Sequence, residues 1–381
     1  MDIWKLNLRH LRAVMAIAQQ GSISAAARAV SITQPAITQG LARLEEHLGE
    51  ALFERRPDGM RPTEAGELVV SRVAAAMGHI RSVRVTMAQM HAFVALAREG
   101  SYASAAHKTG LSQPSLHRAI SDLAIVLRRQ LVERHGKTIG LTQQGRLVAR
   151  RFRLAEAELR ACMIELGTLR GGKMGKIVIG AMPLSRARLL PSTCASFVAL
   201  DDGAVIEVVE GAYADLIEPL RDGEIDFMIG ALRSPSPEAL EQTPLFHDQP
   251  MVFARAGHPL AKSRPELAHL AAYDWVVPPR AVPLRESWER WFAKAGLARP
   301  RVPIECGSVI TIREILRETD FLTVLSRDQV RAELEAGWLV PVMQVPAWFH
   351  RTIGVTMRSG WRPTPGHRAF LDHLVQIASQ L

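Results

Sequence analysis

The sequence contains little cysteine and no long apolar segment. Its only three cysteines, Cys162, Cys194 and Cys306, are far apart, and none belongs to a C-x-x-C motif. This argues against a disulfide framework and fits a reducing compartment. Because no apolar run reaches about 18 residues, a transmembrane helix is not expected, and the N-terminus lacks the apolar core of a signal peptide. We therefore expect a cytoplasmic chain of two or three domains that makes no membrane contact.

Motifs that mark enzymes and metal sites are also missing. None of the 13 histidines forms an H-x-x-x-H or H-E-x-x-H pattern. No G-x-S-x-G, P-loop or G-x-G-x-x-G sequence stands at a strand-to-helix turn. The sequence predicts no catalytic residue, no metal and no cofactor.

Positive charge is unevenly distributed along the chain. The formal net charge of the whole chain is +9, of which residues 1–173 carry +11 and residues 174–381 carry −2. Residues 86–173 alone carry +8. A basic half joined to a nearly neutral half indicates a polyanion-binding part and a part with another role. A basic surface that binds no polyanion would give the same net charge, so the sequence motifs must distinguish the two interpretations.

The basic half is an internal repeat. Shifting the sequence by 79 residues aligns two segments without a gap, and 18 of the 60 positions from 11 to 70 are identical. Gly21-Ser22 falls on Gly100-Ser101, and Gln34-Pro35 falls on Gln113-Pro114. A gapless match of this length predicts a duplicated module.

Each copy has the pattern of a winged helix-turn-helix. In the first copy, an apolar helix ends at Gly21, a short alanine-rich helix follows a serine cap, and Thr33 is placed to cap a third helix over residues 34–47. Apolar residues at a spacing of 4, 3 and 4 are buried in that helix, which leaves Thr38, Gln39 and Arg43 outside. Residues 52–59 then predict a β-wing whose arginines can contact phosphates.

The run SISAAARAVSITQPAITQGLARLEEHLGEALFERRPDGMRPTEAG closely resembles the DNA-binding module of LysR-type transcriptional regulators. This resemblance implies double-stranded DNA as a partner, with the third helix in the major groove. Gln39 stands where the family usually carries a basic residue, so the base preference is expected to differ. The second copy departs further, and a typical member of the family has only one. The expected DNA-binding residues of both copies are Thr33, Gln34, Pro35, Thr38, Gln39, Arg43, Arg55, Arg56, Gln113, His117 and Arg118.

A long helix follows each copy. Apolar residues repeat with a 4-3 spacing from Val69 through Val83 to Met87, and again from Val148 to Leu166. Such a stripe is typical of a coiled-coil seam, although it also suits a helix that lies on its own domain. Because linker helices pair two subunits in the resembled family, we expect a homodimer or homotetramer on a quasi-palindromic promoter site.

Strands and helices alternate in the second half of the chain, which predicts a parallel, doubly wound sheet. The motifs GHPLA and RDGEIDFMIG match the family's effector domain, which has a two-lobed, periplasmic-binding-protein-like fold. The segment IGAMPLSRARLLP resembles more narrowly the subgroup named for the galactose-binding-protein regulator.

Loops at the carboxyl ends of the strands should face a cleft between the two lobes, where helix N-termini present free N–H groups. Hydroxyls, helix N-termini and arginines there suit a small organic acid or a sugar derivative. For Ser185 and Ser308, helix capping without ligand contact is an equal alternative. The expected effector-binding residues are Pro183, Leu184, Ser185, Arg186, Pro279, Arg280, Gly307, Ser308 and Thr311.

The fold class expected is therefore multidomain, with two helical winged modules, long linker helices and an α/β two-lobed effector domain. The leading hypothesis is a ligand-responsive, sequence-specific DNA-binding regulator. The alternatives are a small-molecule-binding protein whose duplicated modules serve assembly, and an enzyme on the same fold. The expected boundaries are 1–62 and 87–141 for the modules, 63–86 and 142–170 for the linker helices, and 174–381 for the effector domain, with lobe 1 at about 174–250 and 350–381 and lobe 2 at about 251–349.

Overall fold

The computed structural model describes residues 2–57, 59–135, 138–200, 203–280 and 282–380. The chain divides into two compact units, of which the first is Met1–Gly175 with Arg221–Glu224 and Thr364–Gly366. The second unit comprises Lys176–Leu220, Ile225–Pro363 and His367–Leu381.

The first unit begins with a set of elements that we name the first module. Ser22 accepts a hydrogen bond from the Ala25 N–H and so caps α2, and Thr63 caps α4 in the same way. Thr33 stands at the N-cap of α3, but the predicted side-chain cap is wrong because its hydroxyl makes no capping bond. The elements of the first module are η1(Ile3–Lys5), α1(Leu8–Gln20), α2(Ile23–Ala29), α3(Gln34–Leu48), β1(Phe53–Arg56) and β2(Gly59–Pro62), and the long helix α4(Glu64–Ile80) follows it.

A second module repeats this order from the first α-helix onward. Gly66 and Gly145, 79 residues apart, illustrate how closely the local structures agree. A Cβ on Gly66 would lie 2.0 Å from the Leu52 carbonyl oxygen, and a Cβ on Gly145 would lie 2.0 Å from that of Leu131. Both copies therefore require glycine where the long helix passes the strand. The elements of the second module are α5(Met87–Glu99), α6(Tyr102–Thr109), α7(Gln113–Leu127), β3(Val132–His135) and β4(Thr138–Leu141), and the long helix α8(Gln143–Leu169) follows it.

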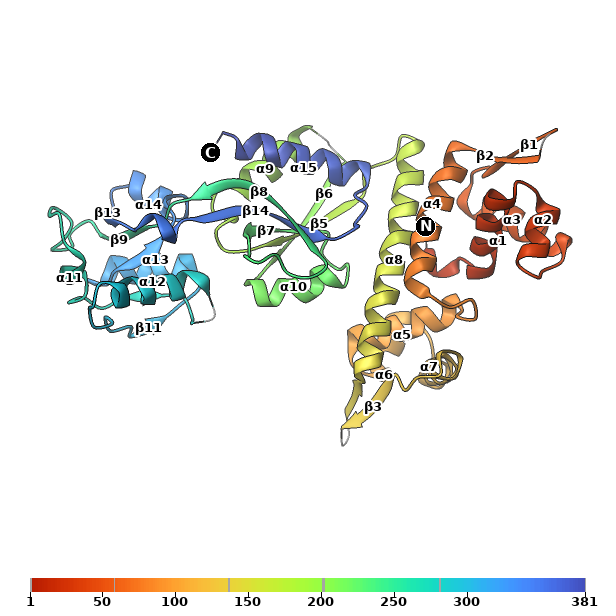
Figure 1. The fold of residues 1–381 in the computed structure, drawn as a ribbon, viewed down its shortest axis with the longest axis horizontal. Coiled ribbons are helices and arrows are strands. Elements are labelled where there is room, and N and C mark those ends of the chain that lie inside the picture. The colour runs from red at the N-terminus through yellow and green to blue at the C-terminus, as the bar shows by residue number, and fades with distance from the viewer. Residues whose placement is uncertain (1, 58, 136–137, 201–202, 281, 381) are drawn as a thin grey trace. The chain divides into compact units, whose positions relative to one another are not determined.

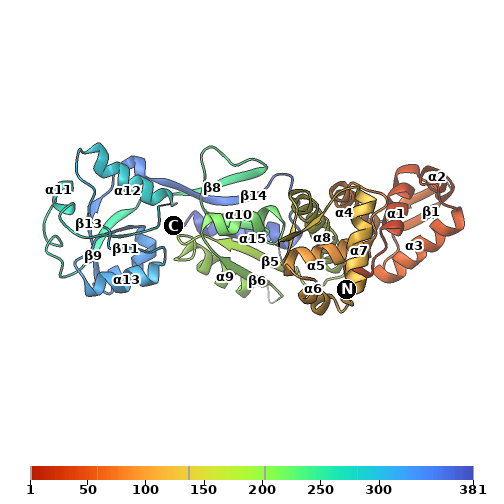
Figure 2. The ribbon, with the colours of Figure 1, turned by 90° about the horizontal axis from the view of Figure 1, so that it is seen from below.

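The two long helices, α4 and α8, lie side by side in both ribbon views (Figures 1 and 2). Apolar residues from both helices are buried in one continuous core that also includes the core residues of both modules. The predicted apolar stripe of the second helix is confirmed, since Val148, Phe152 and Leu159 are all buried. The prediction that the stripe of the first helix continues beyond Ile80 is wrong, because Arg81 adopts a left-handed conformation that ends α4. Val83 is consequently 76% exposed, and Met87 begins the next helix.

The second unit begins with a five-stranded sheet in the order β6-β5-β7-β14-β8. Strands β6, β5 and β7 are parallel, as predicted, but β14 is antiparallel to both β7 and β8. The sheet is therefore mixed, and the prediction of a parallel sheet holds for only three of its strands. These elements are β5(Lys176–Ala181), α9(Leu189–Leu200), β6(Val205–Glu210), α10(Tyr213–Arg221), β7(Phe227–Ala231), β8(Leu240–Asp248), β14(Arg351–Arg358) and α15(Pro365–Ala378).

A smaller lobe lies between β8 and β14 in the sequence. Its central antiparallel sheet has the order β12-β9-β13, and β10 and β11 form a separate parallel pair. An aromatic cluster that includes Trp275, Trp288 and Phe292 fills its core. Its elements are β9(Met251–Arg255), α11(Leu267–Leu270), β10(Val276–Val277), α12(Pro283–Lys294), β11(Ile304–Glu305), α13(Val309–Glu318), β12(Thr323–Leu325), η2(Arg327–Val330), α14(Arg331–Glu335), β13(Leu339–Gln344) and η3(Ala347–Phe349).

Among the described residues, none of the helices has both the length and the apolar character of a membrane span. Among the same residues, no group of three or more histidine, cysteine, aspartate or glutamate side chains is placed to hold a metal ion.

Candidate nucleic-acid interface and effector pocket

Helix α3 is amphipathic in the way that a recognition helix requires. Ile37, Leu41 and Leu44 are buried against the rest of the first module, while Thr38, Gln39 and Arg43 are exposed. Because residues 38, 39 and 43 lie on one face of a helix, their side chains can meet the same surface. Thr33, Gln34 and Pro35 are also exposed, at the N-terminal end of this face.

The buried side of α3 is held tightly against α1. A Cβ on Gly40 would lie 3.0 Å from the His10 ring, so the two helices approach closely at this position. Burial lowers the pKa of His10, and the positive charge of Arg43 lowers it further. The neutral form of His10 is therefore favoured beside Arg43.

The wing of the first module presents arginines. Arg55 and Arg56 are exposed on β1, and β1 pairs with β2 in an antiparallel hairpin. Arg56 forms an ion pair with Glu54 at 3.0 Å. An exposed ion pair of this kind contributes little to stability, so Arg56 can exchange it for a phosphate at small cost.

Helix α7 offers a different outer face. Gln113, His117 and Arg118 are exposed, and Asp122 occupies the position equivalent to Arg43. Tyr102, Gln113, Pro114 and His117 line an open hollow at the start of this helix. The ring centroids of Tyr102 and His117 are 5.4 Å apart.

Tyr102 was not among the residues that the sequence singled out. It opens helix α6, and burial raises its pKa, although the charge of Arg134 acts in the opposite direction. Tyr102 is the repeat of Ile23, and this change from an aliphatic to an aromatic side chain was the signal in the sequence that could have singled it out.

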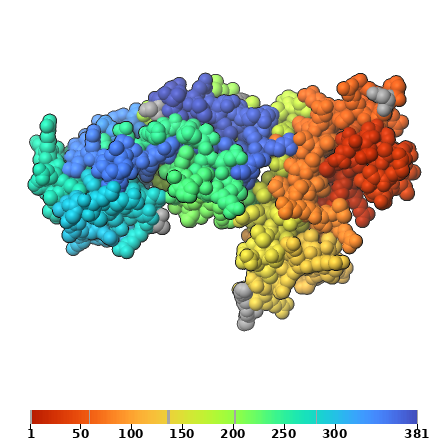
Figure 3. All heavy atoms as spheres, viewed as in Figure 1, coloured from red at the N-terminus to blue at the C-terminus, as the bar shows by residue number. Residues whose placement is uncertain are grey.

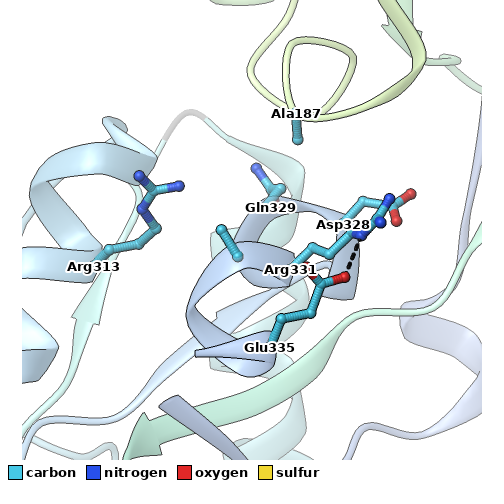
Figure 4. Close-up of a pocket in the computed structure, with 7 residues that line it drawn as sticks. Ala187, Arg313, Asp328, Gln329, Arg331 and Glu335 are labelled. Atoms are coloured by element: carbon cyan, nitrogen blue, oxygen red, sulfur yellow. Dashed lines mark hydrogen bonds and ion pairs between the residues drawn. The ribbon is translucent and has the colours of Figure 1, made fainter. Parts of the chain in front are cut away.

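The second unit contains a pocket of about 190 Å³. Ala187 contributes from the loop after β5, and the other residues come from α13, η2 and α14 of the smaller lobe (Figure 4). Arg331 pairs with Glu335 at 2.7 Å, and Arg313 pairs with the buried Glu333 at 2.9 Å. The lining residues are Ala187, Arg313, Asp328, Gln329, Arg331, Ala332 and Glu335.

None of the nine predicted effector-binding residues, all of which the structure describes, lines this pocket, although several are its neighbours in sequence. Ser185 is fully buried, and its hydroxyl donates a hydrogen bond to the Met182 carbonyl at 2.8 Å. Arg186 forms an ion pair with Glu210. Pro183 is half-buried and Leu184 is buried, whereas Pro279, Arg280 and Gly307 are exposed.

Ser308 caps helix α13, as the sequence suggested. Its hydroxyl oxygen accepts hydrogen bonds from the Thr311 N–H at 3.4 Å and from the Thr311 hydroxyl at 3.1 Å. Arg313 lies two residues after Thr311 on the same helix, and it lines the pocket. Sequence analysis missed Arg313 and Arg331 because charged residues on short amphipathic helices look like ordinary solvated surface.

Comparisons with known proteins agree with this arrangement. Residues 170–379 match the family described as LysR substrate binding domain. Residues 8–67 and residues 87–146 each match the family described as bacterial regulatory helix-turn-helix protein, lysR family.

Related chains are transcriptional regulators. The HTH-type transcriptional regulator GalR of Pseudomonas putida is 29% identical over 100% of this chain and 99% of its own length. The SDS degradation transcriptional activation protein of a Pseudomonas species is 31% identical over 74% of this chain and 92% of its own. The HTH-type transcriptional regulator GbpR of Rhizobium radiobacter is 27% identical over 66% of this chain and 84% of its own.

The fold also matches solved structures. ArgP from Mycobacterium tuberculosis has a TM-score of 0.61 at 19% identity, covering 77% of this chain and 97% of ArgP. A full-length OxyR variant from Pseudomonas aeruginosa has a TM-score of 0.54 at 20% identity, covering 77% of this chain and 98% of OxyR. Taken with the family matches, the exposed face of α3 and the two-lobed second unit, this shows that the chain belongs to the LysR family of transcriptional regulators, which are ligand-responsive DNA-binding proteins and not enzymes.

Proposed function

We propose that α3 of the first module reads base edges of a promoter site through Gln34, Thr38, Gln39 and Arg43. The observation that carries this proposal is the single exposed polar face of α3 on a helix whose other face is buried. An arginine can bond bidentately to guanine and a glutamine to adenine in the major groove. Thr33 and Pro35 position the start of the helix, and Arg55 and Arg56 of the wing contact phosphates, which fix the register but do not read sequence.

The second module is proposed to be a second winged helix-turn-helix that also contacts DNA. Its elements repeat the order of the first module, and its helix α7 exposes Gln113, His117 and Arg118. Under this proposal the modules span about 1–62 and 87–141, the linker helices 63–86 and 142–170, and the effector domain 174–381. A larger share of the positive charge lies in the second module, so phosphate contacts are expected to be more numerous there.

Fluorescence anisotropy tests the reading face. The full-length chain is titrated onto duplexes that it selects from a random library and onto scrambled duplexes, at several salt concentrations. Replacing Thr38, Gln39 and Arg43 together by alanine should abolish the preference for selected DNA, while the equally exposed Arg264→Ala in the second unit should preserve it. An unchanged preference in the triple variant would contradict the proposal.

A small organic acid or sugar derivative is proposed as the effector, bound between the two lobes. Arg313 and Arg331 line the pocket at this position and can bind a carboxylate. The effector is also proposed to contact the neighbouring loop and helix end through Ser185, Ser308 and Thr311. The other proposed effector-binding residues surround these three and are Pro183, Leu184, Arg186, Pro279, Arg280 and Gly307. Closure of the lobes on the ligand would bias how the DNA-binding unit engages its site.

A thermal-shift screen of small carboxylates and sugar acids would identify an effector, and calorimetry would then locate it. Arg313→Ala should weaken binding at least tenfold if the pocket is the site. If only the pair Ser185→Ala and Ser308→Ala weakens it, the effector binds at the loop after β5 and the N-terminus of α13 instead. Binding that is unaffected by either set would contradict the proposed location.

Assembly into a homodimer or homotetramer is proposed from family membership, as is action in the cytoplasm, where promoter DNA is found. Because the apolar stripes of α4 and α8 are buried within the first unit, contacts between chains would have to use other surfaces.

A further inference from the structure

The first unit contains pairs of contacts that exchange places under the 79-residue repeat. Arg72 of α4 reaches Glu158 of α8, with 2.9 Å between Nη1 and Oε2. Arg151 of α8 reaches α4, where its Nε donates to the His79 carbonyl at 2.8 Å. Position 151 is the repeat of position 72, and position 158 is the repeat of position 79. The same two positions therefore meet twice, once in each direction.

A second reciprocal pair lies at the ends of the modules. Arg12 of α1 donates hydrogen bonds to the carbonyls of Val83 and Ser82, in the segment that precedes α5. His91 of α5, the repeat of Arg12, stacks on Trp4, whose repeat is Val83, with ring centroids 4.3 Å apart. Each module thus packs its N-terminal segment against the first helix of the other module.

Reciprocal contacts of this kind define a two-fold arrangement. In a two-fold interface residue i contacts residue j and j contacts i, whereas a head-to-tail arrangement gives each contact only once. The residue numbers also show that α4 and α8 are antiparallel, because Arg72 meets residues 158–165 while His79 and Ile80 meet Arg151. The two modules lie at opposite ends of this helix pair (Figure 1) and form separate bulges of the surface in Figure 3.

The spacing of the modules suits DNA. At a rise of 1.5 Å per residue, this register separates the N-terminal ends of α4 and α8 by roughly 35–40 Å along the pair. One turn of DNA separates successive major-groove sites on one face by about 34–36 Å. Two reading helices in a two-fold arrangement suit an inverted repeat when they lie about one DNA turn apart, and the separation of these helix ends agrees with that spacing.

We propose that a single chain carries both DNA-reading heads, so that one chain occupies a whole inverted site with two unlike halves. The halves differ because the outer face of α3 presents Gln39 and Arg43, whereas the equivalent positions of α7 present Arg118 and Asp122. Aspartate accepts a hydrogen bond from cytosine, and arginine binds guanine. This inference rests on the proposed DNA reading by the two modules and adds to it the orientation, the asymmetry and the number of chains per site.

Footprinting of the full-length chain on the duplexes it selects from a random library tests the two halves separately. Arg43→Ala should weaken protection of one half-site and Arg118→Ala that of the other, each by about 10- to 100-fold in affinity. Both residues are exposed, so neither change should disturb folding, and Arg264→Ala is the matched loss of charge elsewhere. Native mass spectrometry of the complex with one short selected duplex should give one chain per duplex, or equal numbers of chains and duplexes in a larger assembly.

Two results would overturn the inference. With the duplex in excess, two chains on each duplex would show that the halves are read by separate chains, because a dimer of chains that each carry both heads would then bind two duplexes. Loss of both halves in Arg43→Ala with no effect of Arg118→Ala would show the same. Failure of the full-length chain to enrich or protect any duplex would instead contradict the proposed DNA reading itself, and the inference would fall with it.

Discussion

Arg72 is the most informative single residue for the stability of the helix pair. Only 3% of its side chain is exposed, and its guanidinium binds Glu165 and Glu158, whose side chains are 11% and 12% exposed. Burial lowers the pKa of Arg72, but the hydrogen bonds that its guanidinium donates to the two carboxylates outweigh this effect and raise the pKa overall. Arg72→Met would leave two carboxylates close together and nearly buried, without a cation.

Breaking a buried ion pair by removing one partner costs about 3–5 kcal/mol. Amides of α4 and α8 that exchange by separation of the helices should then exchange roughly 100- to 4,000-fold faster. Arg151→Met is the matched control at the equivalent position. It removes hydrogen bonds to two carbonyls at a helix end, and its expected cost is about 1–2 kcal/mol.

Hydrogen–deuterium exchange followed by mass spectrometry of peptides from α4 and α8 measures the effect in the full-length chain. Adding Glu158→Gln and Glu165→Gln to Arg72→Met should restore most of the lost protection, because no uncompensated charge remains. The reasoning would be refuted if Arg72→Met exchanged no faster than Arg151→Met, or if the triple variant were as unstable as the single one.

Three further predictions concern other sites. Gly66→Ala should lower the free energy of unfolding by more than about 2 kcal/mol, because the new Cβ would overlap a carbonyl oxygen. Gly78→Ala, in an open part of the same helix, should raise the free energy of unfolding by up to about 1 kcal/mol. Urea unfolding compares the two variants, and equal effects would contradict the close approach at Gly66. Burial raises the pKa of Cys162 to about 12, so iodoacetamide at pH 8 should leave it unlabelled in the folded chain while the half-buried Cys306 reacts; equal labelling would disprove this. Burial lowers the pKa of His91 in the folded chain. Its contribution to the free energy of unfolding is therefore fully present above pH 6.5 and is lost as the pH falls below that value, because the unfolded chain binds the proton first. The drop in urea midpoint between pH 7.5 and 5.5 should be smaller in His91→Gln, and an identical drop would rule out this contribution.

Local signals in the sequence were sufficient for the first module. The 4-3-4 spacing of α3, the glycine after α1 and the serine before α2 act within a few residues of one another, and the structure contains each helix they predicted. The end of α4 was missed because the apolar spacing continues through Val83, and no glycine or asparagine marks the left-handed conformation that Arg81 adopts.

Long-range pairing accounts for the errors in the second unit. Strand β14 is more than a hundred residues from β7 and β8, and no local pattern shows that it runs antiparallel between them. The pocket was missed for a similar reason, because Ala187 and Arg313 meet only after both lobes have folded.

Both apolar stripes could be predicted from the sequence, but the helix against which each stripe packs could not. A 4-3 stripe is equally satisfied by a second subunit and by a helix of the same chain. The crossing of Arg72 to Glu158 and Glu165 is what identifies α8 as the partner of α4.

A charge exchange tested within one chain and between chains addresses this pairing most directly. Arg72→Glu should strongly reduce the exchange protection of α4 and α8, because it places a third carboxylate beside Glu158 and Glu165. Combining it with Glu165→Arg in the same chain should restore protection, while co-expression of the two single variants as separate chains should not. Restoration by the separate chains would show that α4 pairs with α8 of another subunit, and would contradict a single chain that carries both reading heads as one unit.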